Sequence, residues 1–121
     1  MSRLDSTELI QGKLLLQPPH YEKHEQLICA LEGFISLKLV PHINRQELYV
    51  GQSKRGFDSD GNIVSLGGTK VGVNESPVNF FNFDYDIYPL LTEIEFRYTI
   101  VLKEGDCMYI PAYYFYSFLG N

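Results

Sequence analysis

The chain has 121 residues, enough for a single domain. Apolar residues make up 45% of the chain and charged residues 21%, a balance that excludes disordered and collagen-like proteins. Lys and Arg number 10 against 15 Asp and Glu, so the formal net charge is −5, and no basic stripe indicates a nucleic-acid partner. We therefore expect one folded domain over residues 1–121 that does not bind nucleic acid.

The cysteines and the hydropathy pattern indicate an intracellular, soluble protein. Cys29 and Cys107 are too few for a disulfide framework, and reduced thiols in a cytosolic or organelle-matrix setting fit them. The polar start, MSRLDSTELI, carries no signal-peptide core. The longest apolar stretch, 107–119, is interrupted by Pro111 and Ser117 and falls short of the roughly 20 residues that a membrane span requires. We expect no transmembrane segment.

The composition predicts an all-β fold. Nine Tyr and eight Phe stand against only two Ala, which favours strands over helices. The start of the chain, with Ser6, Thr7 and Glu8, could cap at most a short turn.

Three strands are predicted in the first part of the chain, over residues 13–17, 20–31 and 34–40. The first ends at Pro18-Pro19, because proline has no N–H to donate to a ladder. The second and third are expected to form a hairpin that turns at Gly33. The alternation in the third puts Ile35, Leu37 and Leu39 on one face, which should be the core face.

Residues 51–77 are expected to form a loop-rich insertion, because glycine occurs there six times among polar residues. A small hairpin turning at Asp60-Gly61 fits within it. Further strands are predicted over 78–83, 95–102, 107–110 and 114–118, with a turn at Gly105-Asp106. Many short strands with hardly a helix indicate a barrel or a sandwich.

Two segments far apart in the chain carry motifs. The first, PHYEKHEQLIC over 19–29, is similar to a P-H-Y-D-x-x-x-N run, and the second, GDCMYIPAYYFY over 105–116, is similar to G-D-x-hydrophobic-Y-I-P-A-G-W-W-H. Together they resemble the Jumonji-C branch of the cupin superfamily, the iron- and 2-oxoglutarate-dependent protein hydroxylases and demethylases. The resemblance covers about residues 13–121. It implies a double-stranded β-helix, the cupin or jelly-roll barrel, here incomplete and with few helices.

The resemblance implies a metal site at positions 20, 22 and 116. Such a site takes two imidazoles and one carboxylate. Spacing of two residues on a strand puts His20 and Glu22 on one face, although Glu replaces the family's Asp. The distal histidine position is Tyr116, and a phenol with a reference pKa of about 10 is a poor ligand for Fe(II). We expect these three to be vestigial positions that hold no metal; any metal that did bind would use His20 and Glu22.

The cosubstrate site that the resemblance implies is altered as well. In the hydroxylase branch that matches best, a lysine two residues after the turn glycine pairs with the 2-oxoglutarate carboxylate, and that position is Ile35 here. The Asn of the first motif is Gln26, and the small glycine before the tryptophan pair is Tyr113. We therefore expect no cofactor.

Two functional hypotheses follow. The first is a degenerate Jumonji-C/cupin-like module, a pseudoenzyme without hydroxylase activity that serves as a structural or protein-interaction subunit of a larger assembly. The second is an Fe(II)/2-oxoglutarate-dependent protein hydroxylase or metal-binding cupin that uses His20, Glu22 and a substitute third ligand such as Tyr116 or water.

The first hypothesis includes a location for the partner. The strands at 114–118 and 13–17 are expected to be unpaired sheet edges, which proteins protect with charges, a covering element or a partner chain. The segment 109–121 carries no charge that would protect it. We expect other protein subunits to contact this edge through Tyr113, Phe115 and Phe118.

Overall fold

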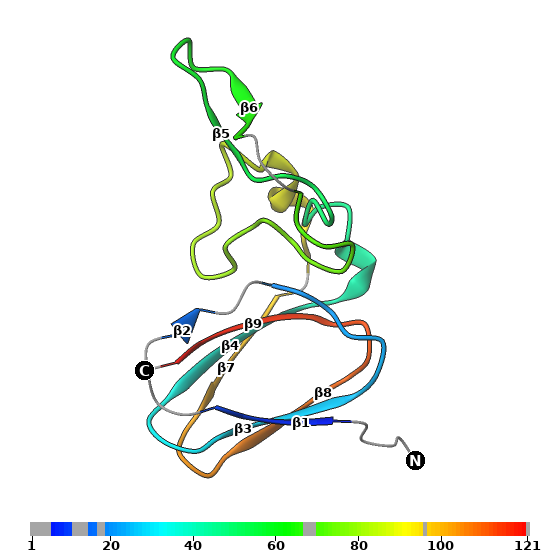
Figure 1. Ribbon diagram of the computed structural model, residues 1–121, viewed down its shortest axis with the longest axis vertical. Coiled ribbons are helices and arrows are strands. Elements are labelled where there is room, and N and C mark those ends of the chain that lie inside the picture. Colours follow the sequence, from blue (N-terminus) through cyan, green and yellow to red (C-terminus); the bar gives the residue numbers. More distant parts are fainter. Residues whose placement is uncertain (1–5, 11–14, 17–18, 67–69, 96, 121) are drawn as a thin grey trace.

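The computed structural model describes residues 6–10, 15–16, 19–66, 70–95 and 97–120, and every structural statement below concerns those residues. The chain forms two tiers: facing sheets in the lower half of Figure 1, and an irregular region, residues 41–94, above them. Regular structure in the described residues consists of strands and two short 3-10 helices. The all-β prediction is confirmed.

The described strands are β1 (Ser6–Ile10), β2 (Leu15–Leu16), β3 (Gln26–Ala30), β4 (Ile35–Val40), β5 (Arg55–Phe57), β6 (Ile63–Ser65), β7 (Tyr98–Leu102), β8 (Cys107–Ile110) and β9 (Phe115–Gly120). The 3-10 helices are η1 (His42–Asn44) and η2 (Pro89–Glu93). One sheet has the order β1-β3-β8, a second has the order β2-β9-β4-β7, and β5 pairs with β6 in a third. The first two sheets make the sandwich.

The interior of the sandwich is apolar. Strand β4 alternates as predicted, with Ile35, Leu37 and Leu39 buried and Ser36 and Lys38 only partly so. Residues of the facing sheet complete the core, which comprises Ile28, Ala30, Ile35, Leu37, Leu39, Leu102, Ile110, Tyr116 and Phe118. Burial at every second residue is what a sheet with one inward face produces.

The predicted hairpin between the second and third strands is wrong. Strand β3 pairs with β1 and β8, whereas β4 pairs with β9 and β7, so the two lie in different sheets. The turn at Gly33 does exist, with a positive φ of 65°, but it carries the chain across the core from one sheet to the other. The backbone of Ala30, at the end of β3, bonds to the turn at Gly105 and Asp106, which leads into β8.

Several element boundaries also differ from the predictions. The predicted strand over 20–31 begins only at Gln26, because the chain bends at residues 23–24. A strand, β1, runs parallel to β3 where at most a short turn was expected. Of the predicted strand over 13–17, only Leu15 and Leu16 are described, and they form β2.

Residues 78–83 form turns instead of the predicted strand. Val78 and Phe80 are buried in a second core, and Asn79 Oδ1 accepts a hydrogen bond from the N–H of Phe81. A side chain that bonds the backbone two residues ahead favours a turn over a sheet ladder.

The expected open edge at the last strand is wrong. Strand β9 lies inside its sheet, paired along its length with β4 and at its end with β2, where Leu15 and Leu16 stand opposite Gly120 and Leu119. The edges of this sheet are β2 and β7.

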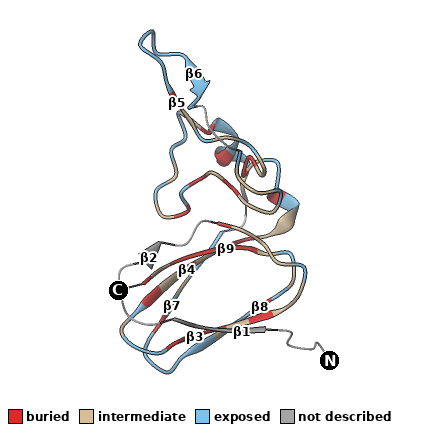
Figure 2. Ribbon diagram, viewed as in Figure 1, coloured by how far each residue is buried: buried red, intermediate tan, exposed pale blue. Residues whose placement is uncertain are grey.

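The second core lies on the outer face of the same sheet. Val40 and Phe115 point away from the sandwich interior and are covered by residues of the irregular region, among them Leu48, Tyr49 and Tyr88. The hairpin predicted at Asp60-Gly61 is confirmed, and its strands β5 and β6 project from the top of the molecule in Figure 1. Figure 2 shows that this projecting hairpin is largely exposed.

The expectation of reduced thiols is also wrong. The register of β3 and β8 places Cys29 opposite Cys107, with a Cα–Cα distance of 4.0 Å, and the two side chains form a disulfide. Their separation of 78 residues in sequence hid this pairing. In the described part of the chain, none of the helices has the length and apolar character needed to cross a membrane.

Candidate functional site

His20 is fixed beside Tyr116 by backbone hydrogen bonds. The His20 N–H donates to the Tyr116 carbonyl over 3.1 Å, and the Tyr116 N–H donates to the His20 carbonyl over 2.9 Å. This isolated bridge extends the pairing of β9 and brings the two rings to a centroid distance of 4.5 Å with a 50° tilt. The two positions, 96 residues apart in the sequence (116 minus 20), therefore meet in the structure.

Glu22 joins this pair. Its Oε1 lies 3.5 Å from Nε2 of His20, and its side chain is about one third exposed. The Glu22 carbonyl accepts a hydrogen bond of 2.8 Å from the N–H of Tyr113, which ties the segment to the turn before β9. The structure thus brings together the three positions singled out in the sequence: His20, Glu22 and Tyr116.

Tyr116 faces the sandwich interior and is 1% exposed. Its hydroxyl donates a hydrogen bond to Gln26 Oε1, and Gln26 is the residue that replaces the Asn of the motif. Tyr116 and Gln26, which both depart from the family motif, therefore satisfy each other's hydrogen-bonding groups. A buried hydroxyl and a buried amide need such partners, since either group left unpaired would cost about 1–3 kcal/mol.

The residues at this site do not fit an Fe(II) centre with two imidazoles and one carboxylate. The donors that converge are one imidazole, one carboxylate and a phenol that is engaged with Gln26. Nowhere among the described residues do three His, Cys, Asp or Glu side chains come close enough to hold a metal ion. Such a site needs a second imidazole.

The cosubstrate position does not fit a carboxylate either. Ile35 is fully buried in the sandwich core, whose described members are all aliphatic or aromatic. Lys38, the nearest lysine along the strand, points to the outer face, and its Nζ donates a 2.9 Å hydrogen bond to Thr99 Oγ1. An unpaired carboxylate in apolar surroundings is strongly disfavoured.

The expected contact residues divide into two groups. Tyr113 is 45% exposed, whereas Phe115 and Phe118 are 0% and 1% exposed. The expectation that Phe115 and Phe118 offer a contact surface is therefore corrected: Phe115 packs in the second core and Phe118 in the sandwich.

Sequence reasoning missed His42, which joins an aromatic cluster with Tyr21, Tyr113 and Phe115. The His42 ring stacks on Phe115 at 5.7 Å and meets Tyr21 edge-on at 4.9 Å. Burial lowers the pKa of His42, and the nearby Arg45 lowers it further. No spacing in the linear sequence connects His42 with Tyr21, so the sequence held no signal for this cluster.

Comparison with known proteins agrees with the fold and the motifs. The family model for the cupin-like domain matches residues 6–118. JmjC domain-containing protein F of Dictyostelium discoideum is 28% identical over 102 residues, which is 84% of this chain and 21% of that protein. The chain therefore spans about a fifth of the length of this relative. It belongs to the cupin-like domain family, as the resemblance to Jumonji-C cupins predicted.

Proposed function

We propose that this chain is a cupin-like module without hydroxylase activity that acts as a structural or protein-interaction subunit of a larger assembly. One observation carries the proposal: the side chains at the positions where the resemblance places a metal ligand and a cosubstrate ligand are already engaged within the protein. Tyr116 is bonded to Gln26 in place of a free metal ligand, and Ile35 is packed in place of a cationic side chain. Loss of either the distal metal ligand or the cationic partner of the cosubstrate would impair an Fe(II)/2-oxoglutarate enzyme.

The exposed apolar residues support the interaction role. Strand β7 is an edge of its sheet, and Tyr98 and Val101 on it are 45% and 56% exposed. Phe34, which precedes the neighbouring strand β4, is 53% exposed. An edge strand with apolar side chains favours pairing with another chain.

The first experiment measures metal affinity. Mn(II), Fe(II) and Zn(II) are titrated into the wild type and into the double variant Glu22→Asp/Tyr116→His, which restores the donor set of the family. We expect no stoichiometric metal in the wild type and at least a tenfold gain in affinity in the double variant. The matched control is Glu22→Asp/Tyr109→His, because Tyr109 is an exposed tyrosine on β8.

Equal affinity in the wild type and the double variant would contradict the proposal that position 116 decides metal binding. Stoichiometric Fe(II) in the wild type would favour the alternative function, a metal-binding cupin or hydroxylase. The contact of 3.5 Å between His20 and Glu22 is the observation that supports this alternative.

The second experiment tests the interaction role by size-exclusion chromatography with light scattering. We expect the isolated chain to self-associate and the Val101→Lys variant to do so less, because a charge on an edge strand opposes pairing. Val73→Lys is the control, since Val73 is 88% exposed but lies in the irregular region. A monodisperse wild-type monomer would remove the main support for an interaction subunit.

A further inference from the structure

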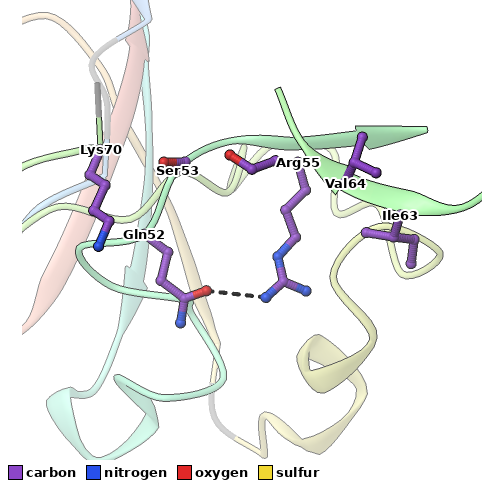
Figure 3. Close-up of a pocket in the computed structure, with 7 residues that line it drawn as sticks. Gln52, Ser53, Arg55, Ile63, Val64 and Lys70 are labelled. Atoms are coloured by element: carbon purple, nitrogen blue, oxygen red, sulfur yellow. Dashed lines mark hydrogen bonds between the residues drawn. The ribbon is translucent and has the colours of Figure 1, made fainter. Parts of the chain in front are cut away.

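A cleft lies beside the projecting β5–β6 hairpin, in the irregular region and not at the His20–Tyr116 cluster (Figure 3). Its volume is about 660 Å³, within the range of small-molecule sites, roughly 300–1,000 Å³. The lining residues come from the segment that leads into β5, from both strands of the hairpin, and from Lys70. The sequence predicted only loops and a small hairpin for this segment, with no ligand site.

The guanidinium of Arg55 is held in place within this cleft. Its Cζ lies 4.4 Å from the centroid of the Tyr49 ring, and its Nη2 donates a 3.1 Å hydrogen bond to Gln52 Oε1. The backbone N–H of Arg55 donates to the hydroxyl of Tyr88 over 3.1 Å. Stacking on one side and a hydrogen bond on another fix the plane of the guanidinium before any ligand arrives.

The ring of Tyr49, on which Arg55 stacks, is held in place by its neighbours. Tyr49 is 3% exposed, and its ring centroid lies 4.9 Å from that of Tyr88. Its hydroxyl accepts a hydrogen bond of 3.0 Å from the N–H of Leu90. Tyr49 also has a positive φ of 55°, a conformation that a bulky aromatic residue adopts only when its surroundings impose it, and that is frequent at functional sites.

The charge of the cleft is opposite to that of the chain. The formal net charge of the protein is −5, yet Arg55 and Lys70 line the cleft and no carboxylate does. Within the described ranges, no Asp or Glu lies within ion-pair distance of either cation. Figure 3 shows the Arg55 and Gln52 side chains directed together into the cleft, with Ile63 and Val64 on the neighbouring strand.

We propose that this cleft binds an organic oxyanion, a carboxylate or phosphate joined to an apolar group. The planar guanidinium of Arg55 would take the oxyanion through two parallel N–H bonds, and Lys70 would add a second positive charge. Ile63, which is 42% exposed and shares its face of the hairpin with Arg55, would contact the apolar group. Both the anion and the apolar group contribute to affinity, because the lining supplies a partner for each.

The test is a ¹H–¹⁵N NMR titration of the full chain with phenyl phosphate, benzoate and inorganic phosphate. We expect saturable shifts at residues 52–55, 63–65 and 70 with phenyl phosphate or benzoate, and the stronger of these two identifies the anion. Inorganic phosphate should bind more weakly, because it lacks the apolar group. No saturable shift with any probe, or equal affinity for inorganic phosphate, would overturn the proposal.

Variants locate the site. Arg55→Gln and Lys70→Gln should each weaken binding at least about tenfold, the effect of losing a charge-assisted hydrogen bond. Lys54→Gln is the matched control, because it removes a positive charge from the residue next to Arg55. Lys54 itself lines a different pocket, together with Glu75. Lys70 is exposed, so Lys70→Gln tests the site even if Arg55→Gln disturbs packing on Tyr49. An equal loss in all three variants would reduce the effect to net charge and overturn the proposal.

Discussion

The sandwich and the irregular region above it are stabilised by different kinds of contact. In the sandwich, backbone ladders join strands that are distant in sequence, and alternate side chains fill one apolar interior. In residues 41–94, short-range side-chain-to-backbone hydrogen bonds fix turns, for example at Asp58 and Asp84. The regular tier is therefore governed by burial, and the irregular tier by turn chemistry and aromatic packing.

The comparison also concerns where each region leaves room for a ligand. The sandwich interior, which would hold the metal and cosubstrate in the hydroxylases that the chain resembles, is packed with residues such as Ile35 and Tyr116. The cleft with an oriented cation lies instead beside the β5–β6 hairpin. The sandwich interior is filled by side chains, whereas the described residues beside β5 and β6 leave a cleft lined by Arg55 and Lys70.

Truncation of the sandwich core should have the largest effect on stability. Leu37 is fully buried at the centre of β4, so Leu37→Ala should lower the free energy of unfolding by about 2–5 kcal/mol. Urea denaturation measures this loss. Val73→Ala in the irregular region, at a site 88% exposed, should change it by less than about 0.5 kcal/mol. Similar losses in the two variants would break the distinction between the tiers.

Loss of the disulfide should come next. Cys29 and Cys107 join β3 to β8 across 78 residues of sequence, so reduction should cost about 2–4 kcal/mol by freeing the unfolded chain. The measurement is urea denaturation with and without dithiothreitol. The double variant Cys29→Ala/Cys107→Ala should not respond to the reductant. Two titratable thiols in oxidised wild-type protein would contradict the pairing.

A buried hydroxyl in the irregular region should have an intermediate effect. Ser76 is 2% exposed; its Oγ donates to the Leu48 carbonyl over 2.7 Å and accepts from the Val78 N–H over 3.1 Å. Ser76→Ala leaves both groups unpaired and should cost about 1–3 kcal/mol. Thermal unfolding compares it with Ser65→Ala on the exposed strand β6, which should be nearly neutral. A neutral Ser76→Ala would mean that turn chemistry contributes little to this tier.

The smallest expected effect is on pH dependence. Burial, with a further contribution from Arg45, lowers the pKa of His42 below the unfolded value of about 6.5. The unfolded chain therefore takes up the proton first, so the stability tied to neutral His42 is complete above the unfolded pKa and is lost as the pH falls through the folded pKa. His42→Gln should flatten this part of the curve of unfolding free energy against pH. Parallel curves for the wild type and the variant would refute the role of His42.

The sequence predicted the strands of the sandwich better than it predicted which of them pair. Alternation identified the inward face of β4 at Ile35, Leu37 and Leu39, because a strand with one buried face repeats every two residues. It could not decide which strands pair. A glycine turn such as Gly33 serves equally for a hairpin and for a crossing between sheets, so β3 and β4 were paired wrongly.

The candidate site was predictable only through motifs. His20 and Glu22 lie close in sequence, and the second motif supplied position 116, so their proximity followed from the resemblance. The hydrogen bond from Tyr116 to Gln26 and the approach of His42 to Tyr21 depend on tertiary packing. The Arg55 cleft was not predicted, because nothing in the spacing of Tyr49, Gln52 and Arg55 indicates that a ring and an amide would meet one guanidinium.

The central claim is that the sandwich interior does not accept 2-oxoglutarate. A ¹H–¹⁵N NMR titration with Zn(II) and 2-oxoglutarate together tests it directly and distinguishes the interior from the cleft, where a carboxylate could bind at Arg55. We expect the resonances of Ile35, Leu37 and Tyr116 to stay in place, with any saturable shifts confined to the residues around Arg55. Saturable shifts at Ile35 and Tyr116 that require both additions would contradict the claim and favour an active metal-dependent oxygenase.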